Sequence, residues 1–343
     1  MECLGEGKSK GLNQMFMNRS AIKLANIDAI LDFRLTQNSA TSPFLFVDLC
    51  GAPGGFSEYL MMRSQDIHRH QTQDMISGSC KGYGMSLLGS NEHGYGTSWK
   101  LCQISNWNYN GTFHTEYKIC NGVDGTGDIY TWENVEQLKR EIQSDMQCLG
   151  MVADAKVQLV VADGGFDAQR DSECQEGLAQ KLVIGEMAAA IDLLQPGGKF
   201  VVKMFGFQSP TIRTAMQSMY DMFQSIQVLK PVSSRPASSE RFVIFEGFRG
   251  MPADTDSGST WQGRVLLGRA AVGHEGRYAA LNAYLDQMDM DILSLNLQAC
   301  FAILSALDRK TTSIYADEDG NQSWNPERLP VNVASYKSAW QLD

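Results

Sequence analysis

Short apolar runs alternate with longer amphipathic stretches over most of the chain. The apolar runs predict strands at 43–50, 81–86, 157–162, 199–205 and 242–247. The amphipathic stretches predict helices at 20–35, 56–64, 177–194 and 211–226. This alternation is typical of βαβ units and predicts an α/β protein with a mostly parallel sheet.

Two regions depart from the alternation. Residues 89–128 are rich in Gly, Asn, Thr and aromatic residues and show weak periodicity, so we expect an irregular insertion near the functional site. At 251–260 the composition becomes that of a linker, and 277–307 is again helical in pattern. We therefore expect a sheet domain over 1–250 and a small, partly helical C-terminal extension over 251–343, whose role is unknown.

Composition narrows the class of protein. Of 343 residues, 43% are hydrophobic and 20% are charged, which favours a packed core over global disorder. The chain begins with polar residues and contains no run of about 18 apolar residues. We therefore expect neither a secretion signal nor a membrane span. The eight cysteines form no CxxC pair and show no zinc-finger spacing, so we expect reduced thiols and no metal site.

The net charge of −10 restricts any contact with nucleic acid. A protein that coats nucleic acid non-specifically usually carries the opposite sign. Binding of nucleic acid would therefore need a local basic patch on an acidic body.

A glycine-rich turn follows the first predicted strand, at 48–56 (DLCGAPGGF). The dinucleotide fingerprint would need glycines where Pro53 and Phe56 stand, and a P-loop ending at Gly7-Lys8-Ser9 would need a glycine where Glu2 stands. A nucleoside ligand without phosphates, such as S-adenosylmethionine, remains compatible with the turn. Asp48 would accept hydrogen bonds from its ammonium group or orient the loop. The alternative is a tight turn that binds nothing.

Four charged residues stand where the pattern expects apolar or neutral ones. Asp163 ends one strand, Lys203 lies inside another, and Glu240 comes just before the last strand. Lys23 is a polar position on the first helix. Two lysines and two carboxylates would form a charge-balanced cluster at the open ends of the strands.

Such a cluster suits the removal of a proton from a ribose 2′-hydroxyl. A lysine whose pKa is lowered by burial and by a second lysine acts as general base, while carboxylates hold it in place. The ordinary alternatives are a solvated helix lysine for Lys23, a salt-bridge partner for Glu240 and a turn residue for Asp163. Lys203 is the hardest to explain as structural, because a lysine within a strand is costly unless it is paired or functional.

Five segments together resemble a known family: MFMNRSAIKLANID, DLCGAPGGFSEYL, ADGGFD, GGKFVVKMF and SSRPASSERF. They are similar to the FtsJ-like ribose 2′-O-methyltransferases, and more narrowly to the eukaryotic-type cap-1 mRNA (nucleoside-2′-O-)methyltransferases. The resemblance covers about residues 15 to 250 in the family's order. It implies a Rossmann-like fold that uses S-adenosyl-L-methionine, with a seven-stranded sheet and helices on both faces.

The resemblance also implies roles for individual residues. The family's catalytic tetrad falls on Lys23, Asp163, Lys203 and Glu240, with Lys203 as the proton acceptor. Expected cofactor contacts, including Asp48 from the turn analysis, are Asn18, Asp48, Cys50, Gly51, Ala52, Pro53, Gly54, Gly55, Phe56, Asp128 and Ile129. Expected contacts to 5′-capped mRNA are Arg19, Glu173, Cys174, Gln175, Arg235 and Ser238, and we also expect Arg241 to meet RNA phosphates.

Two departures from the family limit what it implies. Residues 84–86 read Gly-Met-Ser where many related methyltransferases carry an acidic residue for the ribose, so Asp128 or backbone groups would serve instead. The roughly 90 residues after the core leave little room for the further domains of the long animal enzymes.

We expect a nuclear enzyme if the source is a cell, with association with the capping machinery or RNA polymerase II unproven. A viral enzyme would be cytoplasmic or virion-associated.

Three other functions stay open. An FtsJ-type enzyme acting on rRNA or tRNA would perform the same chemistry, although the SRPxxSER block and the low basic charge argue against it. A catalytically inactive cap-binding subunit would keep the fold, but would have no need for Lys203. A nicotinamide oxidoreductase is disfavoured by the broken fingerprint.

Overall fold

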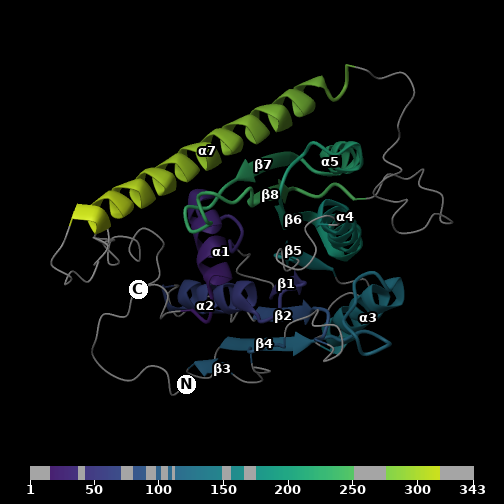
Figure 1. The fold of residues 1–343 in the computed structure, drawn as a ribbon. Coiled ribbons are helices and arrows are strands. Elements are labelled where there is room, and N and C mark those ends of the chain that lie inside the picture. Colours follow the sequence, from purple (N-terminus) through teal and green to yellow (C-terminus); the bar gives the residue numbers. More distant parts are fainter. Residues whose placement is uncertain are drawn as a thin grey trace.

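The computed structural model describes residues 16–37, 43–70, 80–89, 98–101, 107–109, 113–148, 156–165, 175–250 and 276–316. An eight-stranded sheet in the order β3-β4-β2-β1-β5-β6-β8-β7 runs through the centre of the described chain (Figure 1). The strands are β1 (Phe44–Leu49), β2 (Cys80–Met85), β3 (Trp107–Tyr109), β4 (Phe113–Ile119), β5 (Val157–Ala162), β6 (Leu194–Met204), β7 (Ser225–Leu229) and β8 (Arg241–Glu246). The helices are α1 (Arg19–Ile30), α2 (Gly55–His70), α3 (Trp132–Cys148), α4 (Gln175–Leu193), α5 (Pro210–Met222) and α7 (Ala279–Ala316).

The five central strands, in the order β4-β2-β1-β5-β6, are parallel to one another. At one edge, β8 is antiparallel to β6 and β7 is antiparallel to β8. Helices α1 and α2 pack on one face of the sheet, and α3, α4 and α5 pack on the other (Figure 1). The α/β fold with helices on both faces and a mostly parallel sheet is thus confirmed. The sheet has one strand more than the expected seven, because β3 adds a short antiparallel strand beside β4.

Two sequence-based expectations about the strands are wrong. Residues 113–119 were expected to be irregular but form β4, which pairs in parallel with β2. Of the four β4 residues from Glu116 to Ile119, only Tyr117 is buried, so the segment lacks the apolar run of an inner strand. The helix expected to reach residue 226 ends at Met222, and β7 begins at Ser225.

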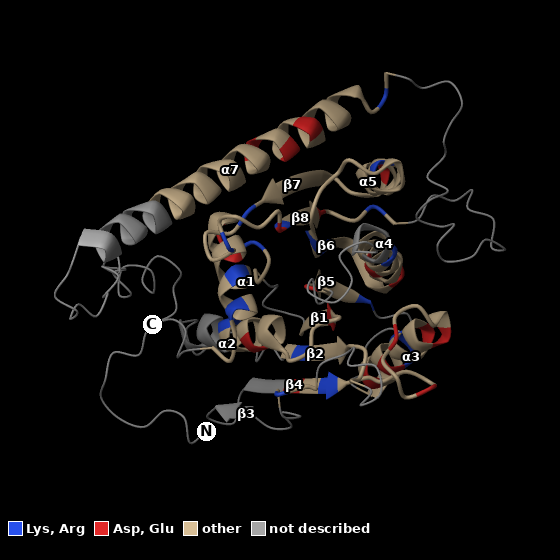
Figure 2. Ribbon diagram, in the orientation of Figure 1, with Lys and Arg blue, Asp and Glu red and all other residues tan. Residues whose placement is uncertain are grey.

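The amphipathic helix α3 was also not predicted from the sequence. Its buried face is formed by Val135, Leu138, Ile142 and Met146, which recur every three or four residues. This stripe packs against the sheet and joins the larger of the two hydrophobic clusters. The other positions of α3 are charged or mostly polar, and Figure 2 shows acidic and basic residues on this helix. The apolar stripe is therefore sparse in the sequence.

The C-terminal helix α7 runs along the β7 edge of the sheet, close to α5 (Figure 1). Leu281, Leu285 and Ile292 are buried in the same hydrophobic cluster as α5. The Tyr284 hydroxyl accepts a hydrogen bond from the backbone of Val228 at 2.9 Å. The first half of α7 is therefore packed onto the sheet, and a domain border at residue 250 stays a prediction. Within the described ranges, no helix is both long and apolar enough to cross a bilayer.

Candidate active site at the carboxyl ends of the parallel strands

The four predicted catalytic residues lie at one end of the sheet. Asp163 directly follows β5, and Lys203 is the penultimate residue of the neighbouring β6. Because β8 is antiparallel to β6, its first residues pair with the last ones of β6, Lys203 opposite Phe242 and Met204 opposite Arg241. This pairing carries Glu240 to the same edge. Ligands of open α/β sheets bind at this edge, outside the carboxyl ends of the strands.

Lys203 and Asp163 form a nearly buried ion pair. The Lys203 Nζ lies 2.9 Å from Asp163 Oδ1 and donates to the Asp163 carbonyl oxygen at 2.9 Å. The other carboxylate oxygen accepts from the Ser20 hydroxyl at 2.6 Å. Only 10% of the Lys203 side chain and 11% of the Asp163 side chain are exposed. Both groups are held in fixed positions, and Ser20 is a site residue that the sequence analysis did not identify.

Lys23 and Glu240 form a second, parallel pair. Their charged atoms are 2.7 Å apart, and the second oxygen of Glu240 accepts from the Ser234 hydroxyl at 2.6 Å. Lys23 is presented by α1, whose first turn is capped by Asn18, since its side chain accepts from the backbone of Ser20 at 3.0 Å. The structure therefore divides the four predicted residues into two ion pairs from four different elements.

The protonation of Lys203 differs from the sequence-based expectation. Burial alone would lower its pKa, but the negative charges of Asp163, Glu240 and Glu186 outweigh burial, and the pKa lies above its ordinary value. The expectation of a lysine with lowered pKa is wrong for the ligand-free protein, in which Lys203 is an ammonium ion. The pKa of Asp163 is lowered: burial opposes this, but the charges of Lys203 and Lys23 prevail.

The glycine turn is built around a buried carboxyl group. Asp48 Oδ2 accepts from the Ser57 hydroxyl at 2.7 Å and from its backbone at 3.2 Å, which ties the end of β1 to the start of α2. The buried Oδ1 has no hydrogen-bond partner among the described residues, and burial raises the pKa of Asp48 to about 7. A Cβ atom on Gly51 would lie 2.2 Å from this carboxyl group, so only glycine fits there. Asp48 orients the loop and keeps one oxygen free for a ligand.

A second loop lies beside this turn. Residues 121–131 follow β4, and hydrogen bonds from Cys120 to Gly84 and from Leu88 to Thr126, both at 2.8 Å, hold them against the end of β2. Asp128 accepts from the backbone of Tyr130 at 2.8 Å, and Ile129 is buried. The ends of β1, β2 and β4 therefore approach one another, as a shared ligand site would require.

The structure adds Glu186, a buried acid that the sequence analysis did not identify. It lies on α4, is fully buried, and its Oε1 is 2.2 Å from the place where a Cβ of Gly164 would stand. The carboxyl group also lies beside the thiol of Cys50, and neither of its oxygens has a hydrogen-bond partner among the described residues. Burial raises its pKa to about 8. The signal in the sequence is a lone glutamate within the apolar stretch 182–191.

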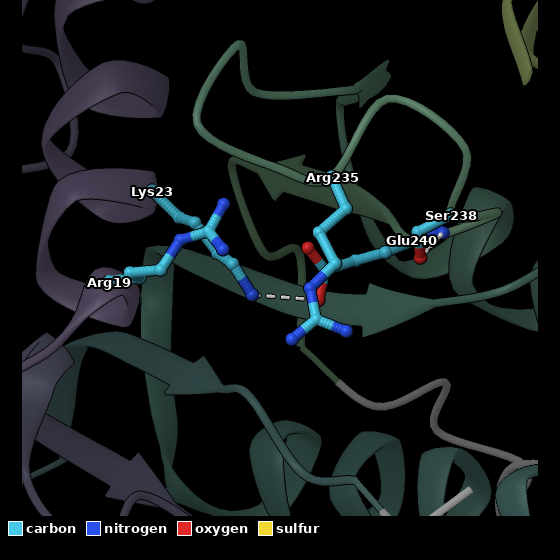
Figure 3. Close-up of a pocket in the computed structure, with 5 residues that line it drawn as sticks. All are labelled: Arg19, Lys23, Arg235, Ser238 and Glu240. Carbon is cyan, nitrogen blue, oxygen red and sulfur yellow. Dashed lines mark hydrogen bonds and ion pairs between the residues drawn. The ribbon is translucent and has the colours of Figure 1, made fainter. Parts of the chain in front are cut away.

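A cavity of about 290 Å³ opens at the Lys23–Glu240 pair. Arg19 and Lys23 reach it from α1, and Arg235 and Glu240 reach it from the segment that leads into β8 (Figure 3). Ser238 completes the lining. Arg19 also donates to the carbonyl oxygen of Ser233 at 2.8 Å, across the cavity. Two predicted catalytic residues and three predicted RNA contacts thus share one cavity.

The structure does not describe the side chains of three further predicted RNA contacts. Glu173 and Cys174 precede the described part of α4, and Gln175 begins that helix but its side chain is not described.

The expectation that Arg241 meets RNA phosphates is wrong. The residue is 3% exposed and forms an ion pair with Asp289 of α7. It also donates to the carbonyl oxygens of Ser239 at 3.1 Å and Phe205 at 3.2 Å. Its guanidinium group is therefore used within the protein.

Among the residues that the structure describes, no three His, Cys, Asp or Glu side chains gather in a way that would hold a metal ion. The chemistry available is that of two lysine–carboxylate pairs beside a glycine turn. This arrangement can position a hydroxyl group and exchange a proton with it.

Two known proteins are similar in sequence to this chain. The chain is 32% identical over 245 residues to the cap-specific mRNA (nucleoside-2′-O-)-methyltransferase 1 of Mus musculus, covering 68% of this chain and 26% of the mouse protein. It is 32% identical over 242 residues to the protein of the same name from Trypanosoma brucei brucei, covering 69% of this chain and 57% of the relative. The chain thus matches about a quarter of one relative's length and somewhat more than half of the other's.

The sequence profile of one family spans both ion pairs and the glycine turn. This profile, described as FtsJ-like methyltransferase, matches residues 16–248, which is more than half of the 343 residues. The chain therefore belongs to the FtsJ-like methyltransferase family.

Proposed function

We propose that this protein is an S-adenosylmethionine-dependent mRNA cap-1 methyltransferase, which methylates the ribose 2′-oxygen of the first transcribed nucleotide of 5′-capped RNA. The observation that carries the proposal is the pairing of Lys203 with Asp163 and of Lys23 with Glu240 at the strand ends, next to a cavity lined by two arginines. The names of the mouse and trypanosome relatives support the choice of capped mRNA.

The glycine turn fits the methionine end of the cofactor. The unpaired, buried Asp48 Oδ1 is an acceptor suited to an ammonium group, and Gly51 leaves the backbone accessible. The neighbouring loop with Asp128 and Ile129 would hold the nucleoside end. The remaining expected contacts, Asn18 and Cys50 to Phe56, lie in or against the turn, since a Cβ on Gly55 would touch the Asn18 side chain at 2.1 Å. The bound cofactor supplies an electrophilic methyl group on a sulfonium.

Lys203 would accept the proton of the 2′-hydroxyl. In the ligand-free protein its raised pKa keeps it protonated. A cation bound at the neighbouring turn lowers this pKa by charge repulsion, and RNA that covers the site adds desolvation, which acts in the same direction. Asp163 fixes the direction of the Lys203 Nζ, and most of the rate comes from this positioning. The Lys23–Glu240 pair would hold the ribose and stabilise the developing oxyanion.

The cavity arginines would bind RNA phosphates, which explains how a chain with a net charge of −10 binds RNA. We expect Arg19→Ala and Arg235→Ala each to weaken RNA binding by a similar factor for all sequences. Each should reduce the slope of log affinity against log salt concentration by about 1. Fluorescence anisotropy from 50 to 300 mM salt measures both effects.

Arg140→Ala is the matched control, since Arg140 is an exposed arginine on α3, away from the cavity. An unchanged salt slope in both cavity variants would contradict the phosphate role.

Selection of the cap itself is proposed to involve Ser238 and the region of Glu173, Cys174 and Gln175. A carboxylate there would offset the positive charge of 7-methylguanine.

Transfer of labelled methyl groups from S-adenosylmethionine tests the proposed function. The substrates are three RNAs of one sequence with a 7-methylguanosine cap, an unmethylated cap or a 5′-triphosphate, and nuclease digestion then locates the label. We expect label on the first-nucleotide 2′-oxygen of capped RNA only. Equal labelling of all three RNAs would contradict selection of the cap and would direct the search to structured RNAs such as rRNA or tRNA. Cofactor binding without any transfer would indicate an inactive cap-binding subunit.

A further inference from the structure

The C-terminal helix α7 carries two nearly buried polar residues that reach the proposed substrate side of the site. Asp289 is 9% exposed and Asn296 is 8% exposed. The helix begins at Ala279, beyond the family match at 16–248, so the family gives it no role. Its buried residues Leu281, Leu285 and Ile292 alternate with these two at intervals of three or four positions, so all five lie on one face.

Asp289 joins the chain segments next to Lys203 and Glu240. It accepts from the backbone of Phe207 at 3.2 Å and from the Gln208 side chain at 2.7 Å, in the loop after β6. It also forms the ion pair with Arg241, the residue that follows Glu240. One carboxylate from outside the family match therefore connects the loop that follows β6, the strand of Lys203, to the first residue of β8, next to Glu240.

Asn296 contacts the segment Ser233–Ser239, which we call the substrate loop because Arg235 and Ser238 line the cavity. Its amide nitrogen donates to the Ser239 hydroxyl at 3.3 Å. With the amide rotated by 180°, an orientation that satisfies both of its polar atoms, the nitrogen donates instead to the carbonyl oxygens of Pro236 at 2.7 Å and Ser238 at 3.0 Å. These are backbone contacts on both sides of Ala237. Asn296 therefore holds the shape of the loop rather than a single side chain.

The helix is anchored firmly enough to act as a support. Its apolar residues belong to the main hydrophobic cluster, and Arg213 of α5 donates to the carbonyl oxygen of Asn282 at 3.2 Å. A loop held by such a support loses less conformational freedom when a ligand binds, which raises affinity without any direct contact.

We propose that α7 is a positioning element for RNA: Asp289 and Asn296 hold the substrate loop and the loop after β6 in the arrangement that binds RNA. This inference rests on the proposed function, since RNA is the ligand of the cavity. It assigns to the C-terminal extension a part in substrate affinity and none in cofactor binding.

Asn296→Ala in the full chain is the principal test. We expect the KM for capped RNA to rise about tenfold, while kcat and the Kd for S-adenosylmethionine stay within twofold of the wild type. Asp289→Asn should show the same split with a larger rise in KM, although it leaves Arg241 buried without its partner. The matched control is Asp291→Asn, an exposed acid on the same helix, which should leave all three constants unchanged.

Amide hydrogen exchange in the ligand-free protein gives a second measurement that needs no activity. In and next to the substrate loop, the backbone amides of Ser234, Ser238 and Glu240 donate to the Pro231 carbonyl, the Arg235 carbonyl and the Ser238 hydroxyl. We expect these amides to exchange faster in Asn296→Ala, with β5 unchanged. An unchanged exchange rate, an unchanged KM, or an equal loss of cofactor affinity and thermal stability would overturn the proposal. If the wild type does not methylate capped RNA, the proposed function fails, and the exchange measurement alone decides whether α7 holds the loop.

Discussion

Lys203→Ala is expected to lower the rate of methyl transfer by about 10²- to 10⁴-fold, the usual contribution of a general acid or base. The affinity for S-adenosylmethionine should not fall, because the hydrogen bonds of Asp48 and of Lys203 are made to different partners, and removal of a positive charge near the cofactor's cation relieves repulsion. Single-turnover transfer of labelled methyl groups, with calorimetry for cofactor binding, measures the two effects separately.

Lys203→Arg separates proton acceptance from charge. Arginine keeps a cation beside Asp163 but stays protonated at any accessible pH. We expect it to be nearly as inactive as Lys203→Ala. The wild-type rate should rise with pH through the neutral range, since Lys203 starts from a raised pKa and must lose its proton before it can accept one. An active Lys203→Arg variant, or a rate independent of pH, would contradict the role of general base.

Glu186→Gln is expected to stabilise the ligand-free protein, and to do so more strongly as the pH rises. In the unfolded chain this carboxyl group ionises near its ordinary pKa of 4.5, whereas in the folded protein burial raises the pKa to about 8. Between these values the folded state keeps a proton that the unfolded state releases, so the free energy of unfolding falls as the pH rises. At about 1.4 kcal/mol per pKa unit, the cost approaches about 5 kcal/mol above pH 8.

Thermal unfolding of the ligand-free protein at pH 5 and pH 8.5 checks this effect. The Tm advantage of Glu186→Gln should be small at pH 5 and should reach about 10 °C or more at pH 8.5, since about 1 kcal/mol corresponds to about 2–4 °C in a domain of 150–250 residues. Glu133→Gln is the matched control, because Glu133 is exposed on α3. An advantage of the same size at both pH values would mean that Glu186 is ionised throughout, paired with Lys203.

The sequence was most informative about the site where a charged residue interrupts the apolar pattern of a strand. Strands β1, β5 and β8 are short apolar runs, and they lie where the pattern placed them. A charged residue inside or at the end of such a run has few structural explanations, which is why Asp163 and Lys203 could be selected without a structure. Strand β4 was not predicted, because only Tyr117 is buried among its last four residues. A strand with so few buried apolar residues is recognised only from its pairing with β2.

By itself, then, the sequence determined the α/β fold, the glycine turn and the set of four charged residues, since each depends on residue types within one short segment. Only the tertiary structure decided that Lys203 pairs with Asp163 and Lys23 with Glu240, and that Arg241 is turned inward to Asp289. The tertiary structure also decided that Lys203 is protonated and that Glu186 is buried. The physical reason is that ion pairing and desolvation depend on distances between segments far apart in the chain, which the register of the sheet and the packing of its helices set.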